Sequence, residues 1–359
     1  MSSSISCGIV GLPNVGKSTI FNALTKGSAL AANYPFATID PNVGIVNVPD
    51  ERLGKLAEIY NSERSIPATI KFVDIAGLVS GASQGEGLGN QFLSHIRECN
   101  LICHVVRDFE DSNVTHVNNK IDPNHDIAVI NTELVLADLR TVDKRLPILE
   151  KQSKADPKLK ASLDRLRLAK KYLDNNTPLN EVDDLDIETL DLNLLSAKPV
   201  IYLFNVDEET MKNKEKLAEL STQVKNKPAI FINAQLEAEL NSLSNEDAKE
   251  LLISYGQDES SLQKLIKLAY KTLGLQSYLT AGPKEVRAWT IKQGSSAPEA
   301  AGVIHTDFQK GFIAAEVVNY QDLISAGSLS HARSLGKVRT EGKTYIMNES
   351  DVVEFRFNV

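Results

Sequence analysis

The stretch Gly11-Leu-Pro-Asn-Val-Gly-Lys-Ser18 decides the fold. It follows the apolar run 8–10 and precedes a helical pattern over 19–24, so it fits GxxxxGK[ST] in the strand-to-helix context of a phosphate-binding loop. Glycines let the backbone curl until successive N–H groups point at phosphate oxygens, and the helix N-terminus adds a positive dipole. The stretch therefore predicts a P-loop nucleotide-binding domain of the α/β class.

The chemistry of such a loop assigns roles to particular side chains. Lys17 would reach the outer phosphates, and the Ser18 hydroxyl would bind Mg²⁺. Asp74 ends an apolar run and is the expected second Mg²⁺ anchor, while Gly77 lets a backbone N–H approach the γ-phosphate. Thr38, in a turn upstream, offers another hydroxyl for the metal.

Further apolar runs predict the rest of a doubly wound, mostly parallel sheet with helices on both faces. They lie at 70–73, 101–106, 200–204 and 229–232. Between about 127 and 196 the apolar residues fall at helical spacing, which predicts a helical hairpin inserted into the sheet domain. Pro147 should kink or end the first helix of that hairpin.

Charge is distributed unevenly along the 359 residues. The net charge is −8, which argues against coating DNA or RNA through overall charge, so any such contact must be local. Segment 144–171 has ten Lys or Arg and three Asp or Glu, a local +7. The last 84 residues are neutral, which indicates domains at 1–275 and 276–359, with a boundary near Gln276.

Composition favours a globular protein of the cytoplasm. Hydrophobic residues are 42% and charged residues 24%, which suits packed cores, and no apolar run approaches the ~20 residues that span a bilayer. Cys7, Cys99 and Cys103 cannot all pair and lie in or beside apolar stretches, as reduced thiols do. Neither a membrane nor DNA is expected as a partner.

Asn205-Val-Asp-Glu208 follows a predicted strand where guanine-specific proteins of this class have Asn-Lys-x-Asp. Glu208 is one methylene too long to replace that aspartate, and Val206 lacks the lysine stem that packs on the base, so ATP is favoured over GTP. Adenine would use backbone groups near Val206 and the Asn205 amide, with Asn233 and Ala234 closing the pocket. The same residues also suit a helix N-cap.

At this level of detail the chain resembles the YchF family, the Obg-like ATPases. The resemblance covers nearly the whole chain and rests on long motifs. They are GLPNVGKS at 11–18, DIAG at 74–77, GEGLGNQFLSH at 85–95, NVDE at 205–208, AGPKEVRAWTI at 281–291 and AAGVIHTDFQKGFIAAEV at 300–317.

The resemblance implies an Obg-type nucleotide domain with a coiled-coil-like insertion, followed by a TGS domain of the ubiquitin-like β-grasp fold. It also implies weak ATP hydrolysis, preference for ATP over GTP, and association with the ribosome, expected at the large subunit or ribosomal RNA through the basic segment. By position, Ser18 and Thr38 would bind Mg²⁺, and Val206 would contact the base. The phosphates would be held by Asn14, Val15, Gly16, Lys17, Ser18 and Thr19. The chain has Asn233-Ala234 where the family usually has Ser-Ala.

Hydrolysis needs a group that orients water, and Leu78 and Val79, which follow Gly77, cannot do so. His116, in a loop after a predicted strand, is the candidate catalytic side chain, and the family is similar there. Asn14 suggests a second route, because related switch proteins use an asparagine at this position to help hold K⁺. K⁺ dependence is therefore a hypothesis.

Two other functions fit the same residues. One is a GTPase of the Obg family with a variant base pocket. The other is a ribosome- or RNA-binding factor in which nucleotide only gates attachment and hydrolysis is incidental. A metabolic kinase is disfavoured, because no feature suggests a pocket for a small acceptor.

Overall fold

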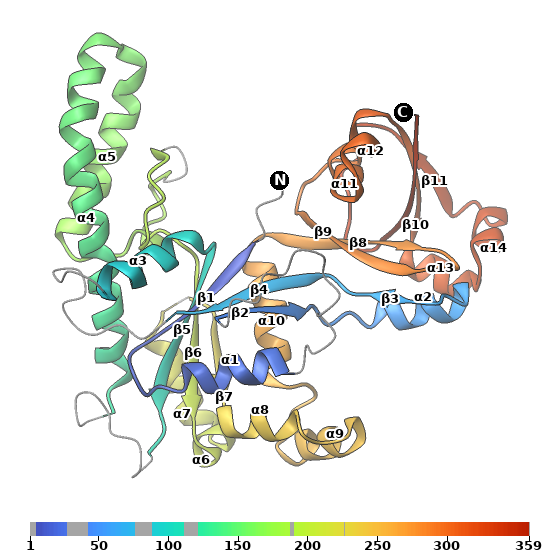
Figure 1. The fold of residues 1–359 in the computed structure, drawn as a ribbon, viewed down its shortest axis with the longest axis horizontal. Helices are drawn as coiled ribbons and strands as arrows, with labels where there is room; N and C mark the ends of the chain where they lie inside the picture. Colours follow the sequence, from blue (N-terminus) through green and yellow to red (C-terminus); the bar gives the residue numbers. More distant parts are fainter. Residues whose placement is uncertain are drawn as a thin grey trace. The chain divides into compact units, whose positions relative to one another are not determined.

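The computed structural model describes residues 5–26, 42–75, 88–110, 121–186, 190–225 and 227–358. The chain forms two compact units (Figure 1). The first contains Met1–Ile45 and Lys71–Leu265, and the second contains Val46–Ile70 and Ile266–Val359. None of the described helices has the length and apolar character that crossing a bilayer requires.

The first unit is built on a six-stranded sheet of order β2-β4-β1-β5-β6-β7. Its strands are β1 (Ser6–Val10), β2 (Val43–Asn47), β4 (Thr69–Asp74), β5 (Leu101–Asp108), β6 (Val200–Val206) and β7 (Ala229–Ile232). β1 pairs in parallel with β4 and β5, and β6 pairs in parallel with β5 and β7. β1 and β6 are buried throughout, as expected of parallel strands covered on both faces. The predicted parallel sheet is confirmed.

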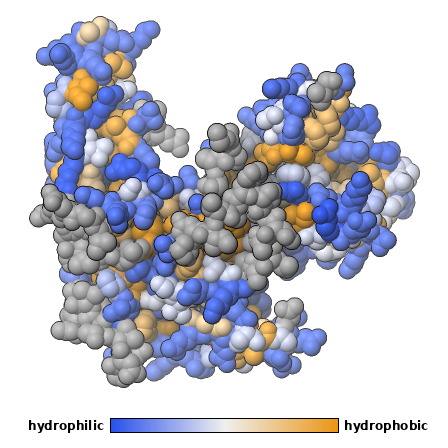
Figure 2. Space-filling view, viewed as in Figure 1, coloured by the Kyte–Doolittle hydropathy of each residue, from blue (hydrophilic) through white to orange (hydrophobic). Residues whose placement is uncertain are grey.

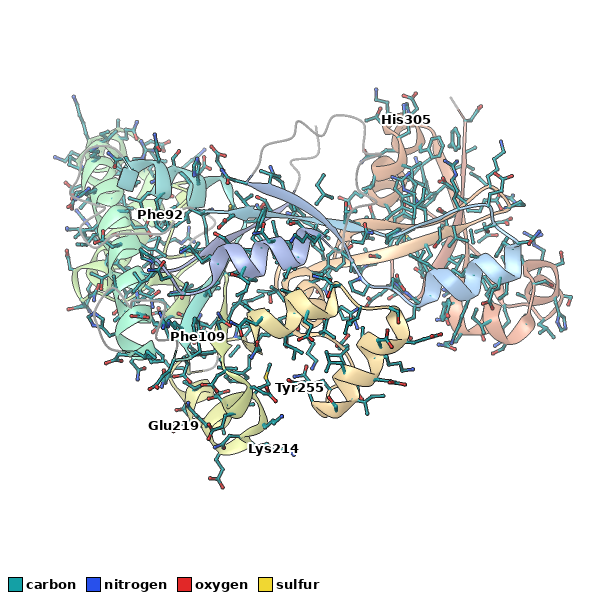
Figure 3. The ribbon with its side chains drawn as sticks, turned by 60° about the horizontal axis from the view of Figure 1, so that its bottom comes forward. Phe92, Phe109, Lys214, Glu219, Tyr255 and His305 are labelled. Atoms are coloured by element: carbon teal, nitrogen blue, oxygen red, sulfur yellow. The ribbon has the colours of Figure 1, made fainter. Side chains whose placement is uncertain are left out.

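Helices connect these strands and cover the sheet. They are α1 (Lys17–Lys26), α3 (Leu88–Glu98), α6 (Glu208–Lys212), α7 (Lys214–Thr222), α8 (Ala234–Leu240), α9 (Asn245–Ser254) and α10 (Ser261–Thr272). α1 and α8 lie side by side, joined by a hydrogen bond from the Asn241 side chain to the Ala23 carbonyl (Figures 1 and 3).

The predicted helical hairpin is present, and it begins slightly earlier than expected. It consists of α4 (Pro123–Ala155), η2 (Pro157–Leu159), α5 (Lys160–Asp174) and η3 (Leu179–Glu181). Asp122 caps α4 by accepting a hydrogen bond from the His125 N–H. Val142, Leu149 and Leu166 belong to the apolar core between the helices, while hydrophilic residues cover most of the hairpin's visible face (Figure 2).

Of the two effects expected of Pro147, a kink or an end of the helix, the second is contradicted, because the proline lies inside α4, which continues to Ala155. A proline in a helix interior costs ~3 kcal/mol. Leu146 and Leu149, on either side of it, pack in the core shared with α5. Burial of several such side chains outweighs the lost backbone hydrogen bond.

Asp138 joins the hairpin to the segment that leads into β6. It is fully buried, and its carboxylate accepts hydrogen bonds of 2.7 Å from the Leu195 N–H, the Ser196 N–H and the Ser196 hydroxyl. Burial raises the pKa of Asp138, and these hydrogen bonds oppose that shift. The carboxylate therefore fixes where the inserted hairpin returns to the sheet.

The second unit contains another six-stranded sheet, of order β11-β10-β12-β8-β9-β3. Its strands are β3 (Ser65–Ile66), β8 (Leu275–Ala281), β9 (Val286–Lys292), β10 (Phe312–Asn319), β11 (Val338–Glu341) and β12 (Asp351–Phe357). β8 pairs antiparallel with β9, β10 pairs antiparallel with β11 and β12, and β12 pairs in parallel with β8.

Helices of the second unit pack against this sheet. They are α2 (Arg52–Tyr60), α11 (Ala297–Ile304), α12 (Thr306–Lys310), α13 (Tyr320–Ala326) and α14 (Leu329–Ser334). The Tyr278 hydroxyl of β8 donates a 2.9 Å hydrogen bond to the Ala300 carbonyl of α11 inside the core. This arrangement is the expected ubiquitin-like β-grasp.

The two compact units divide the chain at other residues than the predicted boundary near Gln276. Val46–Ile70 belongs to the second unit, because β3 pairs in parallel with β9 and Arg52 donates to the Glu349 carbonyl. The second unit then resumes at Ile266. Charge counted along the chain does not reveal a strand pairing between segments so distant in sequence.

We expect Asp138→Ala to lower the free energy of unfolding by about 3 kcal/mol, because two buried N–H groups lose their acceptor. Urea denaturation measures this loss. Asp143→Ala is the matched control on the same helix. Asp143 is exposed and pairs with Lys170, so its removal should cost less than about 1 kcal/mol. Equal losses from the two variants would contradict the assigned role of Asp138.

Candidate functional site

The loop between β1 and α1 has the geometry of a phosphate-binding turn. Asn14 and Gly16 have φ values of 63° and 97°, in the left-handed region. Gly16 is required for space as well, since a Cβ there would lie 2.3 Å from the Asn205 Nδ2 atom. Ile20 donates to the Gly16 carbonyl at the first turn of α1, so the loop ends in a helix N-terminus. Such a turn binds anions through backbone N–H groups.

Lys17 is folded back onto this loop. Its side chain is buried, with 8% of the residue exposed, and its Nζ donates a 2.7 Å hydrogen bond to the Leu12 carbonyl. Burial lowers the pKa of Lys17 to about 8, and the negative charge of Asp74 opposes that shift. A phosphate at the loop would supply the counter-charge that this buried ammonium lacks.

Ser18 and Asp74 lie together at the carboxyl end of the sheet. The Ser18 hydroxyl donates to Asp74 Oδ2 at 3.2 Å, and Asp74, the last residue of β4, pairs in register with Ile9 of β1. Among the described residues Asp74 Oδ1 is buried without a hydrogen-bond partner. A hydroxyl and a carboxylate with an unused oxygen fit the oxygen ligands that Mg²⁺ takes in proteins.

Asn205 connects the phosphate loop to the neighbouring strand ends. It is 5% exposed, its Nδ2 donates to the Val15 carbonyl at 3.0 Å, and its Oδ1 accepts from the Ala234 N–H at 3.2 Å. Both ends of the amide therefore serve to hold two loops together. The sequence had assigned this amide to the base, and the bracing role was not foreseen.

The residues after Asn205 form the start of α6. Val206 is buried, and Asp207 caps the helix by accepting from the Thr210 N–H at 2.8 Å. The helix-cap alternative is thus confirmed, with Asp207 as the capping residue. Glu208 forms a 2.6 Å ion pair with Lys212, and its side chain is 58% exposed. The i,i+4 spacing of Glu208 and Lys212 is the sequence signal that could have predicted this pair.

Asn233 and Ala234 lie at the start of α8. The Asn233 side chain caps α8 by accepting from the Gln235 and Leu236 N–H groups at 3.1 and 2.9 Å. Ala234 is buried and binds Asn205, as described above. The amide that replaces the family's usual serine at position 233 therefore works as a helix cap.

The structure thus brings most of the sequence-predicted site residues to one edge of the first sheet. Asn14, Val15, Gly16, Lys17, Ser18 and Thr19 lie in the loop and first turn of α1, next to Asp74, Asn205 and Ala234. Glu208 is engaged by Lys212. Thr38, Gly77 and His116 lie outside the described residues.

We expect Asn205→Ala to weaken nucleotide binding about tenfold, because the Val15 carbonyl and the Ala234 N–H lose their common partner. Calorimetric titration with ADP measures this. Asn213→Ala is the control. It removes the cap of α7, which costs ~1 kcal/mol of stability, but it should leave the dissociation constant unchanged. Wild-type affinity in Asn205→Ala would refute the bracing role.

Known proteins resemble this chain over its whole length. A family model described as "50S ribosome-binding GTPase" matches residues 6–141, and the YchF-GTPase_C model, described as "Protein of unknown function (DUF933)", matches residues 275–358. "Ribosome-binding ATPase YchF" of Bacillus subtilis (strain 168) is 48% identical, over 99% of this chain and 100% of the relative. The protein of the same name from Haemophilus ducreyi is 49% identical, over 98% and 99%.

A solved structure agrees with these relatives. "Structure of the Schizosaccharomyces pombe YchF GTPase" superposes with a TM-score of 0.87 at 39% identity, covering 98% of both chains. The fold described above is therefore that of a known family. The chain belongs to the YchF family.

Proposed function

We propose that the protein is a ribosome-associated P-loop ATPase that binds ATP with Mg²⁺, hydrolyses it slowly to ADP and phosphate, and acts as a nucleotide-dependent switch. The observation that carries this function is the braced phosphate loop, in which Asn205 holds Val15 while Lys17 lies buried against Leu12. The relatives named "Ribosome-binding ATPase YchF" support it.

The proposed preference for adenine over guanine follows from the hydrogen bonds of Asn205 and the ion pair of Glu208. Both ends of the Asn205 amide are engaged in bracing, Asp207 caps α6, and the exposed Glu208 pairs with Lys212. Among the described residues that follow Asn205, no carboxylate of the required length is then free to accept from the two donors of guanine. Backbone groups beside Val206 and Ala234 can pair with adenine, which makes ATP the proposed substrate. The Schizosaccharomyces pombe relative is named a GTPase, so GTP is the alternative to be tested.

Different residues of the chain would bind the nucleotide, bind the metal and assist hydrolysis. Backbone N–H groups of 14–19 and the Lys17 ammonium would hold the phosphates, and Ser18 and Asp74, with Thr38, would hold Mg²⁺. When bound, Mg²⁺ would neutralise charge on the phosphate oxygens. Gly77 would approach the γ-phosphate. Because Leu78 and Val79 cannot orient water, hydrolysis would be slow. Either His116, or a K⁺ ion held with the help of Asn14, would assist it.

Within the basic segment, the proposed ribosome contact is the end of the hairpin, where α4 is joined to α5. Arg167 pairs with Glu150 at 2.7 Å, Lys170 pairs with Asp143 at 2.7 Å, and Arg165 lies 4.0 Å from Asp186. Four exposed lysines near the turn have no ion pair within the described part of the chain: Lys151, Lys154, Lys158 and Lys160. We assign the contact with ribosomal RNA of the large subunit to this end, because unpaired cations bind phosphate at the lowest cost.

The base assignment is tested with the double variant Val206→Lys plus Glu208→Asp, which restores the guanine-reading pattern. Wild-type protein should bind ATP at least tenfold more tightly than GTP, and the double variant should reduce or reverse that ratio. Calorimetry with each nucleotide and Mg²⁺ provides the measurement. Val206→Lys plus Glu209→Asp makes the same chemical change one position later and should keep the ATP preference. Tighter GTP binding by the wild type would make the protein a GTPase.

Ribosome binding is tested by co-sedimentation at several salt concentrations. Lys158→Gln plus Lys160→Gln should weaken binding roughly tenfold and flatten its salt dependence, because two phosphate contacts are lost. Arg165→Gln plus Arg167→Gln removes the same charge from side chains that already have acidic partners, so its effect should be smaller. Unchanged binding in the lysine variant would exclude the hairpin end as the ribosome contact.

A further inference from the structure

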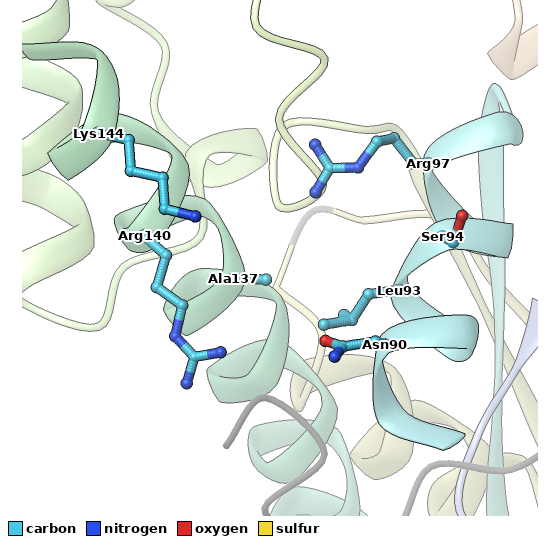
Figure 4. A pocket seen from close by; sticks show the side chains of 7 residues that line it. All are labelled: Asn90, Leu93, Ser94, Arg97, Ala137, Arg140 and Lys144. Carbon is cyan, nitrogen blue, oxygen red and sulfur yellow. The ribbon is translucent and has the colours of Figure 1, made fainter. Parts of the chain in front are cut away.

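A cavity of about 290 Å³ lies between α3 and α4, inside the first unit (Figure 4). α3 contributes Asn90, Leu93, Ser94 and Arg97, and α4 contributes Ala137, Arg140 and Lys144. Leu93 and Ala137 are buried and form its apolar part. None of the described site residues above lines this cavity.

Among the described residues, the charged lining of the cavity is entirely positive. Arg97 comes from one wall and Arg140 and Lys144 from the other, and none of the described lining residues is acidic. In Figure 4 the Arg97 guanidinium and the Lys144 amine point toward one another across the opening. Within the described ranges none of the three cations lies in an ion pair. Like charges i and i+4 on a helix repel, so this arrangement costs stability unless an anion occupies the space.

Two acids of α4 pair with the other long helix of the hairpin. Asp143 and Glu150 form ion pairs with Lys170 and Arg167 of α5. The Arg97 charge acts on Asp138, but the Asp138 carboxylate already accepts three hydrogen bonds from Leu195 and Ser196. Arg140 and Lys144 line the cavity and have no ion pair within the described part of the chain.

The remaining polar lining residues suit an oxyanion. Asn90 and Ser94 each offer a hydrogen-bond donor from α3, on the same wall as Arg97. Guanidinium groups bind phosphate through paired N–H donors, and an ammonium adds a compact charge. Two Arg, one Lys, an amide and a hydroxyl around a cavity of this volume match a phosphate group in both charge and donor number.

We propose that the α3–α4 cavity is a second anion site, which binds the phosphate groups of a small polyphosphate compound separately from the P-loop. A recessed space between two helices admits a compact ligand, whereas nucleic acid could present only a single backbone phosphate at its mouth. Because the cations come from both walls, the bound anion links α3, which follows the DIAG motif in sequence, to the inserted hairpin.

The test uses full-length protein whose P-loop is first filled with fluorescent ADP and Mg²⁺, so that retained fluorescence reports its occupancy. Inorganic tripolyphosphate, supplied with equal Mg²⁺, is then titrated by calorimetry. We expect one tripolyphosphate to bind without displacing the ADP. Affinity should fall as salt is raised, because cations that meet phosphate release counter-ions.

Variants of each wall locate the binding. Arg97→Gln on α3 and Arg140→Gln plus Lys144→Gln on α4 should each weaken tripolyphosphate binding at least tenfold and leave ADP affinity unchanged. Lys214→Gln plus Lys249→Gln is the charge-matched control. Both lysines are exposed in the first unit, and Lys214 lies at the start of α7, away from α3 and α4 (Figure 3).

Titration with a short single-stranded RNA that lacks terminal phosphates tells whether the site takes a free polyphosphate or a backbone phosphate of RNA. Loss of tripolyphosphate binding in the cavity variants supports a free ligand. Loss of RNA binding alone would overturn the small-ligand proposal and make a backbone phosphate the occupant of the site. Absence of any second binding event, or an equal loss in the Lys214→Gln plus Lys249→Gln control, would overturn the assignment, since diffuse charge would then explain the result.

Discussion

The site depends on the Asn205 side chain, whose amide binds the Val15 carbonyl and the Ala234 N–H at once. Asn205 is almost fully buried, so each of these groups would lose a hydrogen bond that water cannot replace. Gly16 must lack a side chain because the Asn205 amide occupies the space of its Cβ. The ends of β1, β6 and β7 therefore fix one another around the phosphate loop.

The first sheet and its phosphate loop could be predicted because their signals are local. A strand, a glycine turn and a helix follow one another at 6–26. Asp74, the expected metal ligand, directly follows the apolar run 70–73. The placement of Val46–Ile70 in the second unit could not be predicted in this way. It depends on the pairing of Ser65 with Val286, and only two residues of β3 take part, too few to leave a pattern.

For two residues, contacts made only in the folded chain outweigh what the neighbouring sequence predicts. Pro147 does not end α4, since the helix is held along its length by the core it shares with α5. Asn205 has hydrogen-bonding groups that suit a base, yet both are consumed by loops that come together only in the folded chain. Sequence spacing identified the residue but not its partners, because those partners lie far away along the chain.

Positive charge is only partly compensated at two places in the first unit, and the same physics accounts for both. Burial lowers the pKa of Lys17, which donates to a neutral carbonyl and has the Asp74 charge nearby, and the described lining of the α3–α4 cavity has three cations and no acid. Each arrangement costs stability in the empty protein and is relieved when phosphate binds. A bound ligand then stabilises the folded state by mass action, through its contacts with these elements. A protein that changes state with its ligands needs such places, because only a group that is better satisfied in one state can shift the balance between states.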